Sequence, residues 1–95
     1  MKMENKVTLQ FSKSITRLAG YKYGLSEYEN QCKNKIDFKK PIIIEFPDNI
    51  EKLASSFIQG FFAEFIKEIG YDGIEKNVDI ISSSNLKEQV MNNLI

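Results

Sequence analysis

Three short segments of the chain carry hydrophobic patterns typical of β-strands. Apolar and polar residues alternate through residues 6–12, which predicts a half-buried strand at the edge of a sheet. Residues 41–46 begin with a proline and continue with three isoleucines, a pattern that predicts a central strand covered on both faces. The apolar residues within 78–82 predict a third strand.

Between the first two predicted strands, the apolar residues recur at spacings of three and four. Residues 15–33 are therefore predicted to form a helix, with Ser14 as its N-cap. The apolar stripe of this helix consists of Leu18, Tyr21, Leu25, Tyr28 and Cys32. Gly20 and Gly24 lie four residues apart on one face, which predicts a close approach to a strand or another helix. A bend or break at the glycines is the alternative.

The strongest helical pattern covers residues 55–69. Phenylalanine recurs there every four residues, at Phe57, Phe61 and Phe65, and this ladder is predicted to form the core. Ser55 or Ser56 is expected to cap the start of the helix, and Gly70 is expected to end it before a turn at residues 71–73.

The last pattern predicts a helix over residues 86–94, capped by Ser84 or Asn85, with Glu88 as the capping-box partner of Asn85. The order of elements is then β-α-β-α-β-α. Such alternation predicts an α/β fold with a mainly parallel sheet and helices packed against it. With 95 residues, the chain is expected to form a single small domain, residues 1–95.

Composition narrows the functional classes. Histidine is absent, which removes the commonest general base and metal ligand, and no nucleophile–base pair is evident, so we expect no enzyme, no metal and no cofactor. Cys32 is the only cysteine; this excludes an intramolecular disulfide and favours a reducing compartment. No segment is apolar enough for a membrane span or a signal peptide, so a cytoplasmic protein is expected.

Charge is unevenly distributed although the net charge is zero. Residues 1–40 contain nine Lys/Arg and four Asp/Glu, whereas residues 41–95 contain four and nine. One interpretation is a binding surface for nucleic acid or a phosphate ligand, built from Arg17 and the basic stretch Lys33–Lys40. The other is that folding interleaves the two halves into a mixed surface, and this is favoured because Asp37 dilutes the stretch.

Residues 42–46 and 54–62 together resemble a known family. The strand ending in Glu45-Phe46, the short connection and the Ser55-Ser56-Phe57 start of an apolar helix are similar to the small bacterial and phage STAS-like domains of unknown function. The resemblance extends forward to the terminal helix and back to Thr16-Arg17. The chain departs from the family pattern in having Glu45 where an aspartate is usual, and Gln59 and Gly60 where acids are frequent.

This resemblance implies a protein-interaction and signalling module. Domains of the anti-sigma-factor-antagonist kind present a serine at a helix start, which a GHKL-type kinase phosphorylates to switch partner binding. By resemblance, Ser55 and Ser56 are the candidate phospho-acceptors and partner contacts, Arg17 is a candidate contact to phosphate or partner, and a GHKL-type ATPase is the candidate partner. Plain helix caps and a surface ion pair are the alternatives for these residues. The sequence leaves open whether the chain forms a homodimer.

Overall fold

A computed structural model describes residues 5–94 of the chain. Its main sheet consists of β1 (Lys6–Thr8), β3 (Ile42–Glu45) and β5 (Val78–Ile81), hydrogen-bonded in the order β1-β3-β5 with all strands parallel. The three predicted strands, the parallel sheet and the central position of β3 are thus confirmed. The ladder of β1 is shorter than the predicted residues 6–12, although Leu9 still donates a backbone hydrogen bond to Glu45, with N and O 2.8 Å apart.

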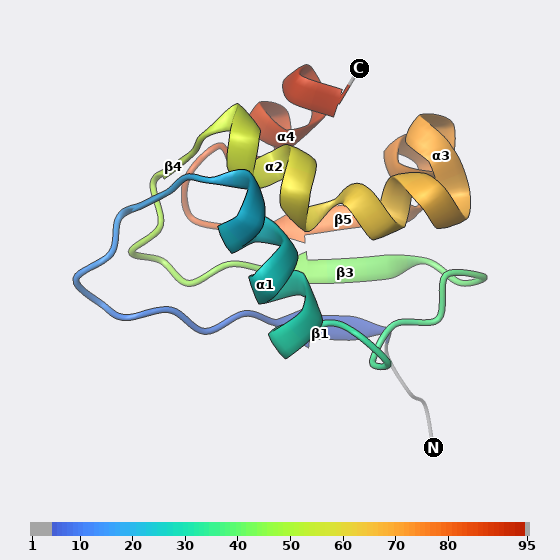
Figure 1. Cartoon of the computed structure of the whole chain (residues 1–95), viewed down its shortest axis with the longest axis horizontal. Coiled ribbons are helices and arrows are strands. Elements are labelled where there is room, and N and C mark those ends of the chain that lie inside the picture. Colours follow the sequence, from blue (N-terminus) through green and yellow to red (C-terminus); the bar gives the residue numbers. More distant parts are fainter. Residues whose placement is uncertain (1–4, 95) are drawn as a thin grey trace.

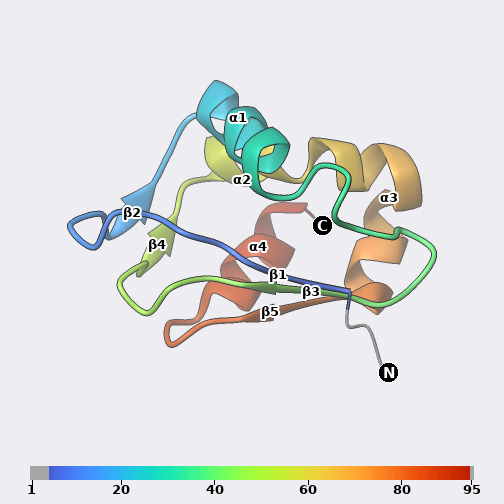
Figure 2. The same ribbon diagram turned by 90° about the horizontal axis from the view of Figure 1, so that it is seen from below.

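Helices cover one face of this sheet. They are α1 (Tyr21–Gln31), α2 (Ser55–Phe61), α3 (Ala63–Asn77) and α4 (Leu86–Leu94). The sheet is drawn face-on in Figure 1 and edge-on in Figure 2, where α1, α2 and α4 lie on the same side of it. Burial alternates to match: Val7, Ile42, Ile44, Val78 and Ile80 are buried toward the helices.

No element of the described residues 5–94 covers the opposite face of the sheet, so the prediction that β3 is covered on both faces is wrong. Ile43 and Glu45 are only partly buried there, and Ile81 of the neighbouring strand is 40% exposed. Three isoleucines in a row are equally compatible with one covered face, because a strand of four residues contributes only two side chains to each side.

A second, two-stranded parallel sheet was not predicted. It pairs β2 (Arg17–Leu18) with β4 (Lys52–Leu53) and is continued by a backbone bond from Ala54 N to Leu18 O of 2.8 Å. This pairing corrects the predicted helix over residues 15–33, because residues 16–18 use their backbone groups in the ladder. Ser14 is therefore not the N-cap of α1. The N-cap is Gly20, whose φ of 109° favours glycine.

The predicted helix over residues 55–69 is interrupted at Phe62. This residue has φ −94° and ψ 8°, which ends α2 and starts α3. Phe61 and Phe62 are both fully buried, with ring centroids 5.0 Å apart. Consecutive residues of a straight helix point about 100° apart, so the interruption brings both rings into one core.

Gly70 has a positive φ of 73°, as expected for a helix-ending glycine, yet the predicted turn at residues 71–73 is wrong. The chain resumes a helical path after Gly70 and continues to Asn77, directly before β5. At the C-terminal end, the predicted helix is confirmed as α4. Asn85 contacts the Glu88 side chain, and its carbonyl oxygen accepts from Gln89 N at 3.3 Å.

Candidate interaction site

The β2–β4 ladder positions the sequence-predicted site residues. Leu18 and Leu53 pair in register and are buried, whereas the preceding register pair, Arg17 and Lys52, is exposed. Both strands lead directly into a helix, β2 into α1 and β4 into α2. Because the two strands are parallel and in register, the starts of α1 and α2 lie next to each other (Figure 1).

The two helices also approach each other unusually closely. A Cβ atom at Gly24 of α1 would lie 2.5 Å from the carbonyl oxygen of Phe57, and one at Gly60 of α2 would lie 2.1 Å from that of Tyr21. Neither glycine has space for a side chain. The predicted close approach at Gly24 is thus confirmed, with a helix as the neighbour, while Gly20 marks the predicted break. Gly60 departs from the family pattern, and the close contact with the backbone of Tyr21 explains why this position is a glycine.

Ser55 and Ser56 are both exposed at the start of α2. The prediction that one of them is the N-cap is wrong, because Ala54 occupies that position and the helix has no side-chain cap. Instead, the Ser56 hydroxyl accepts a hydrogen bond from Gly20 N at 2.9 Å, which joins the starts of α1 and α2. Within residues 5–94, no hydrogen bond involves the Ser55 hydroxyl, so Ser55 is the freer of the two.

The first pair of the β2–β4 ladder consists of two cations. Arg17 and Lys52 lie directly opposite each other across the ladder, a like-charge arrangement that is unfavourable in a sheet. The ion pairs found in the described part of the chain are Lys6–Glu45 and Lys87–Asp79, so neither Arg17 nor Lys52 forms an ion pair there. The exposed Glu51 is the chain neighbour of Lys52. The prediction that Arg17 makes an ordinary surface ion pair is therefore not supported by the described residues. The ladder instead presents two cations opposite each other, of which Lys52 lies shortly before Ser55 in the chain.

The basic stretch Lys33–Lys40 forms the exposed connection between α1 and β3. A groove of about 450 Å³ between this connection, α1 and α3 is lined by both Lys33 and Lys67 and by both Glu29 and Glu64. Folding has therefore brought acidic residues of α1 and α3 to part of the basic stretch. The nucleic-acid or phosphate-ligand alternative stays a prediction, and this groove does not present one sign of charge.

Cys32 is fully buried at the end of α1, as the prediction of a small core residue required. Burial raises the pKa of its thiol to about 12, and burial likewise raises the pKa of Tyr28 to about 12, with Glu64 adding to the shift. The thiolate, which is the reactive form of cysteine, is thus disfavoured at neutral pH. No group of three or more potential metal ligands occurs in residues 5–94.

These pKa values predict a loss of stability at alkaline pH. The folded chain keeps the Cys32 proton up to about pH 12, whereas the unfolded chain releases it near 9. The unfolded state then binds fewer protons, so the free energy of unfolding should fall as pH rises above about 9. Urea titrations between pH 8 and 11 measure this decline. In Cys32→Ala, the onset should move to about pH 10, where Tyr28 would ionise in the unfolded chain. Identical pH profiles for the two proteins would contradict the assignment.

Comparison with known proteins identifies the family. The family model described as a STAS-like domain of unknown function (DUF4325) matches residues 28–88. The chain belongs to this family. The match includes Ser55 and Ser56, whereas Arg17 lies outside it, so the resemblance at Thr16-Arg17 is not part of the match. Searches of curated proteins and of solved structures found no significant match.

The STAS-like assignment agrees with the observed architecture of a parallel sheet and helices. No helix in the described part of the STAS-like chain is long and apolar enough to cross a membrane. The sequence predicts Arg17, Ser55 and Ser56 as site residues. In the structure Arg17 belongs to the first pair of the β2–β4 ladder, whereas Ser55 and Ser56 follow its second pair, at the start of α2. Nothing in the sequence indicates Lys52 as the partner of Arg17, or the hydrogen bond between Gly20 and Ser56. No periodic signal could have indicated Lys52, because its role depends on a two-residue strand pairing.

Proposed function

We propose that this STAS-like chain is a non-catalytic protein-interaction module whose partner contacts the exposed end of the β2–β4 ladder and the start of α2. The observation that carries the proposal is that two exposed serines begin α2 directly after β4, whose Lys52 lies opposite Arg17, and that neither cation forms an ion pair within the described residues. Exposed, unpaired cations favour a partner with an acidic surface, since opposite charges steer and orient association.

We further propose that phosphorylation of Ser55 or Ser56, both exposed at the start of α2, regulates this contact. A phosphate there would carry a charge of about −1.5 to −2, opposite in sign to the cations of the ladder that precedes α2. It would compete with an acidic partner for Arg17 and Lys52. A GHKL-type ATPase is our proposed partner and kinase, on the basis of the resemblance to anti-sigma-factor antagonists. Ser55 is the preferred acceptor, because the Ser56 oxygen already accepts from Gly20.

Aspartate substitutions test this switch. Ser55→Asp and Ser56→Asp should leave the fold intact, because an acidic residue in the first turn of a helix is favourable. Each should weaken binding to the cognate GHKL-type ATPase by about tenfold or more, equivalent to at least about 1.4 kcal/mol. The measurement pairs thermal unfolding with calorimetric titration of the ATPase. Ser26→Asp, which places the same charge on an exposed position of α1, is the matched control and should bind normally.

The alanine variants separate a phosphate switch from simple packing. Ser55→Ala should bind the unphosphorylated partner as the parent does and should lose phosphate incorporation from ATP, measured by mass spectrometry. Ser56→Ala should also lose its bond to Gly20, at a cost of about 1 kcal/mol of stability. Unchanged affinity in both aspartate variants would restrict these serines to structural roles. If the chain instead binds nucleic acid, and this binding weakens as the salt concentration rises, the alternative function would be favoured.

A further inference from the structure

The two edges of the main sheet differ in how their backbone groups are used. Ile43 donates to Asn5 O at 2.9 Å and Leu9 donates to Glu45 O at 2.8 Å. The backbone N–H and C=O groups of the odd-numbered residues in and around β1 therefore face β3. The backbone N–H and C=O groups of Lys6 and Thr8 therefore face the free edge. On the other side, Phe46 donates to Ile81 O at 2.9 Å, which leaves the backbone of Ile80 facing the free edge of β5.

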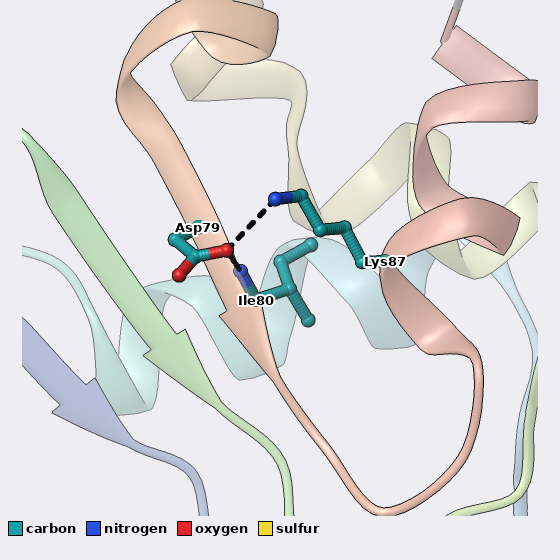
Figure 3. A network of polar contacts seen from close by, with 3 residues as sticks. All are labelled: Asp79, Ile80 and Lys87. Atoms are coloured by element: carbon teal, nitrogen blue, oxygen red, sulfur yellow. Dashed lines mark hydrogen bonds and ion pairs between the residues drawn. The ribbon is translucent and has the colours of Figure 1, made fainter.

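The free edge of β5 is blocked by side chains. Ile80 N–H donates to Asp79 Oδ1 at 3.0 Å, and Lys87 of α4 reaches the same oxygen at 2.9 Å (Figure 3). The hydrogen bond from Lys87 holds the pKa of Asp79 below its usual range, so the carboxylate stays charged. The outward amide of β5 is thereby satisfied, and a charged pair lies beside it, an arrangement that protects edge strands from further pairing.

Among residues 5–94, side chains satisfy the free edge of β1 at one position only. The Gln31 side chain accepts from Gln10 N at 2.7 Å and donates to Gln10 O at 3.0 Å, the same pair of bonds that a residue of an added strand would make. No comparable contact is found in residues 5–94 for the outward groups of Lys6 and Thr8. They border a groove of about 370 Å³, open to solvent, whose other side is formed by Asn30, Gln31 and Lys35.

We propose that this edge of β1 is a docking site for an extended, acidic segment of a partner protein, which adds to the sheet beside Lys6–Thr8. Main-chain bonding supplies two donors and two acceptors at Lys6 and Thr8, as in other cases of strand addition. Charge selects the segment, because the charged residues lining the groove are Lys6 and Lys35. Lys6 shares its charge with Glu45 at 3.2 Å, whereas Lys35 makes no ion pair within the described residues. Opposite charges on neighbouring strands are stabilising.

This docking site is separate from the serines of the proposed function. It lies on β1 and the end of α1, whereas Ser55 and Ser56 lie at the start of α2. The two proposals therefore fail independently. Variants at Thr8 and Lys35 test the edge, and the serine variants test the switch.

Thr8 offers a matched pair of variants. Thr8→Pro removes the outward N–H of the edge and keeps the bonds of Val7 and Leu9 to β3, because proline is tolerated where its nitrogen faces away from the ladder. Thr8→Val keeps the N–H and removes only the hydroxyl. Both variants lose the hydrogen bond from the Thr8 hydroxyl to Glu45. A difference in peptide affinity between them therefore reports the contribution of the Thr8 amide. Lys35→Glu tests the charge and requires no change in a strand.

The probe is a displayed library of ten-residue peptides, selected on the full chain and counter-selected on Thr8→Pro. Selected sequences should be enriched in Asp and Glu. As synthetic peptides, they should bind Thr8→Val within about twofold of the parent and bind Thr8→Pro and Lys35→Glu at least tenfold more weakly. Amide hydrogen exchange at Lys6 and Thr8 should be fast in the free chain and slow in the complex. If Thr8→Pro does not fold, Lys35→Glu and the exchange rates decide the result.

Four results would overturn the proposal. One is a selection that yields no peptide discriminating against Thr8→Pro or Lys35→Glu. A second is slow exchange of Lys6 and Thr8 in the dilute free chain, which would mean that the chain covers its own edge. The third is exchange that slows with protein concentration alone, which would make a second copy the occupant. The fourth is a set of selected peptides that is not enriched in Asp and Glu, which would show that the edge does not select an acidic segment.

Discussion

Replacing Phe61 with alanine is expected to lower the free energy of unfolding by about 3–5 kcal/mol. Phe61 is fully buried, and its ring lies 5.6 Å from that of Phe57, stacked at 19°. It also contacts rings from three other parts of the fold, namely Tyr28 of α1, Phe46 after β3 and Phe65 of α3. A cavity at this junction would affect both the packing of helices on the sheet and the packing of helices on each other.

Urea denaturation followed by circular dichroism measures this loss. Domains are stable by only about 5–15 kcal/mol, so much of the variant is expected to be unfolded at modest urea concentrations. Tyr71→Ala is the matched control, because it removes an aromatic ring that is 48% exposed; its effect should stay within about 0.5 kcal/mol. An unchanged midpoint for Phe61→Ala would show that this ring does not support the core.

Gly24→Ala is expected to destabilise the domain by about 1–3 kcal/mol, the opposite of its effect in an isolated helix. Alanine is favoured over glycine inside a helix by about 1 kcal/mol, so helix propensity alone predicts stabilisation. In this fold, however, the new Cβ would lie 2.5 Å from Phe57 O and 2.6 Å from Phe61 N. Both atoms belong to the backbone of α2, which cannot move aside as a side chain can.

Ser26→Ala provides the control for this sign reversal. Ser26 lies on the exposed side of α1, two residues from Gly24, and an alanine there gains helix propensity without meeting α2. Thermal unfolding of the two variants should therefore move the midpoint in opposite directions, or leave Ser26→Ala unchanged. A higher midpoint for Gly24→Ala would mean that α1 and α2 are farther apart in solution than the structure shows.

Local periodicity was sufficient for the larger elements. The phenylalanine ladder at residues 57, 61 and 65 predicted a buried helical segment, and all three rings are fully buried. The alternation from residue 6, the isoleucines after Pro41 and the apolar residues from Val78 predicted the three strands that pair in parallel. These signals are reliable because a covered strand or helix face must repeat with the period of its own backbone.

The sequence predicted only some of the residues of the candidate site. Ser55, Ser56 and Arg17 were selected through a family resemblance, and the family match at residues 28–88 includes the serines alone. Their spatial relation depends on β2 and β4, two strands of two residues each, which are too short to produce a period. The same pairing converted the expected first turns of α1 into extended chain and put Lys52 opposite Arg17.

The sequence alone indicated most of the residues that enter the core, because hydrophobic burial depends on side-chain type and on the period of the element that carries it. Tyr21 is an exception: it was predicted on the apolar stripe of the first helix and is 50% exposed. Only the tertiary structure decided which face of the sheet stays open, where the long helix is interrupted at Phe62 and which glycine meets a neighbouring backbone. It also decided that the β5 edge is closed by Asp79 and Lys87 while Lys6 and Thr8 remain accessible. These features arise from contacts between residues far apart in the chain, and such contacts leave no regular spacing in the sequence.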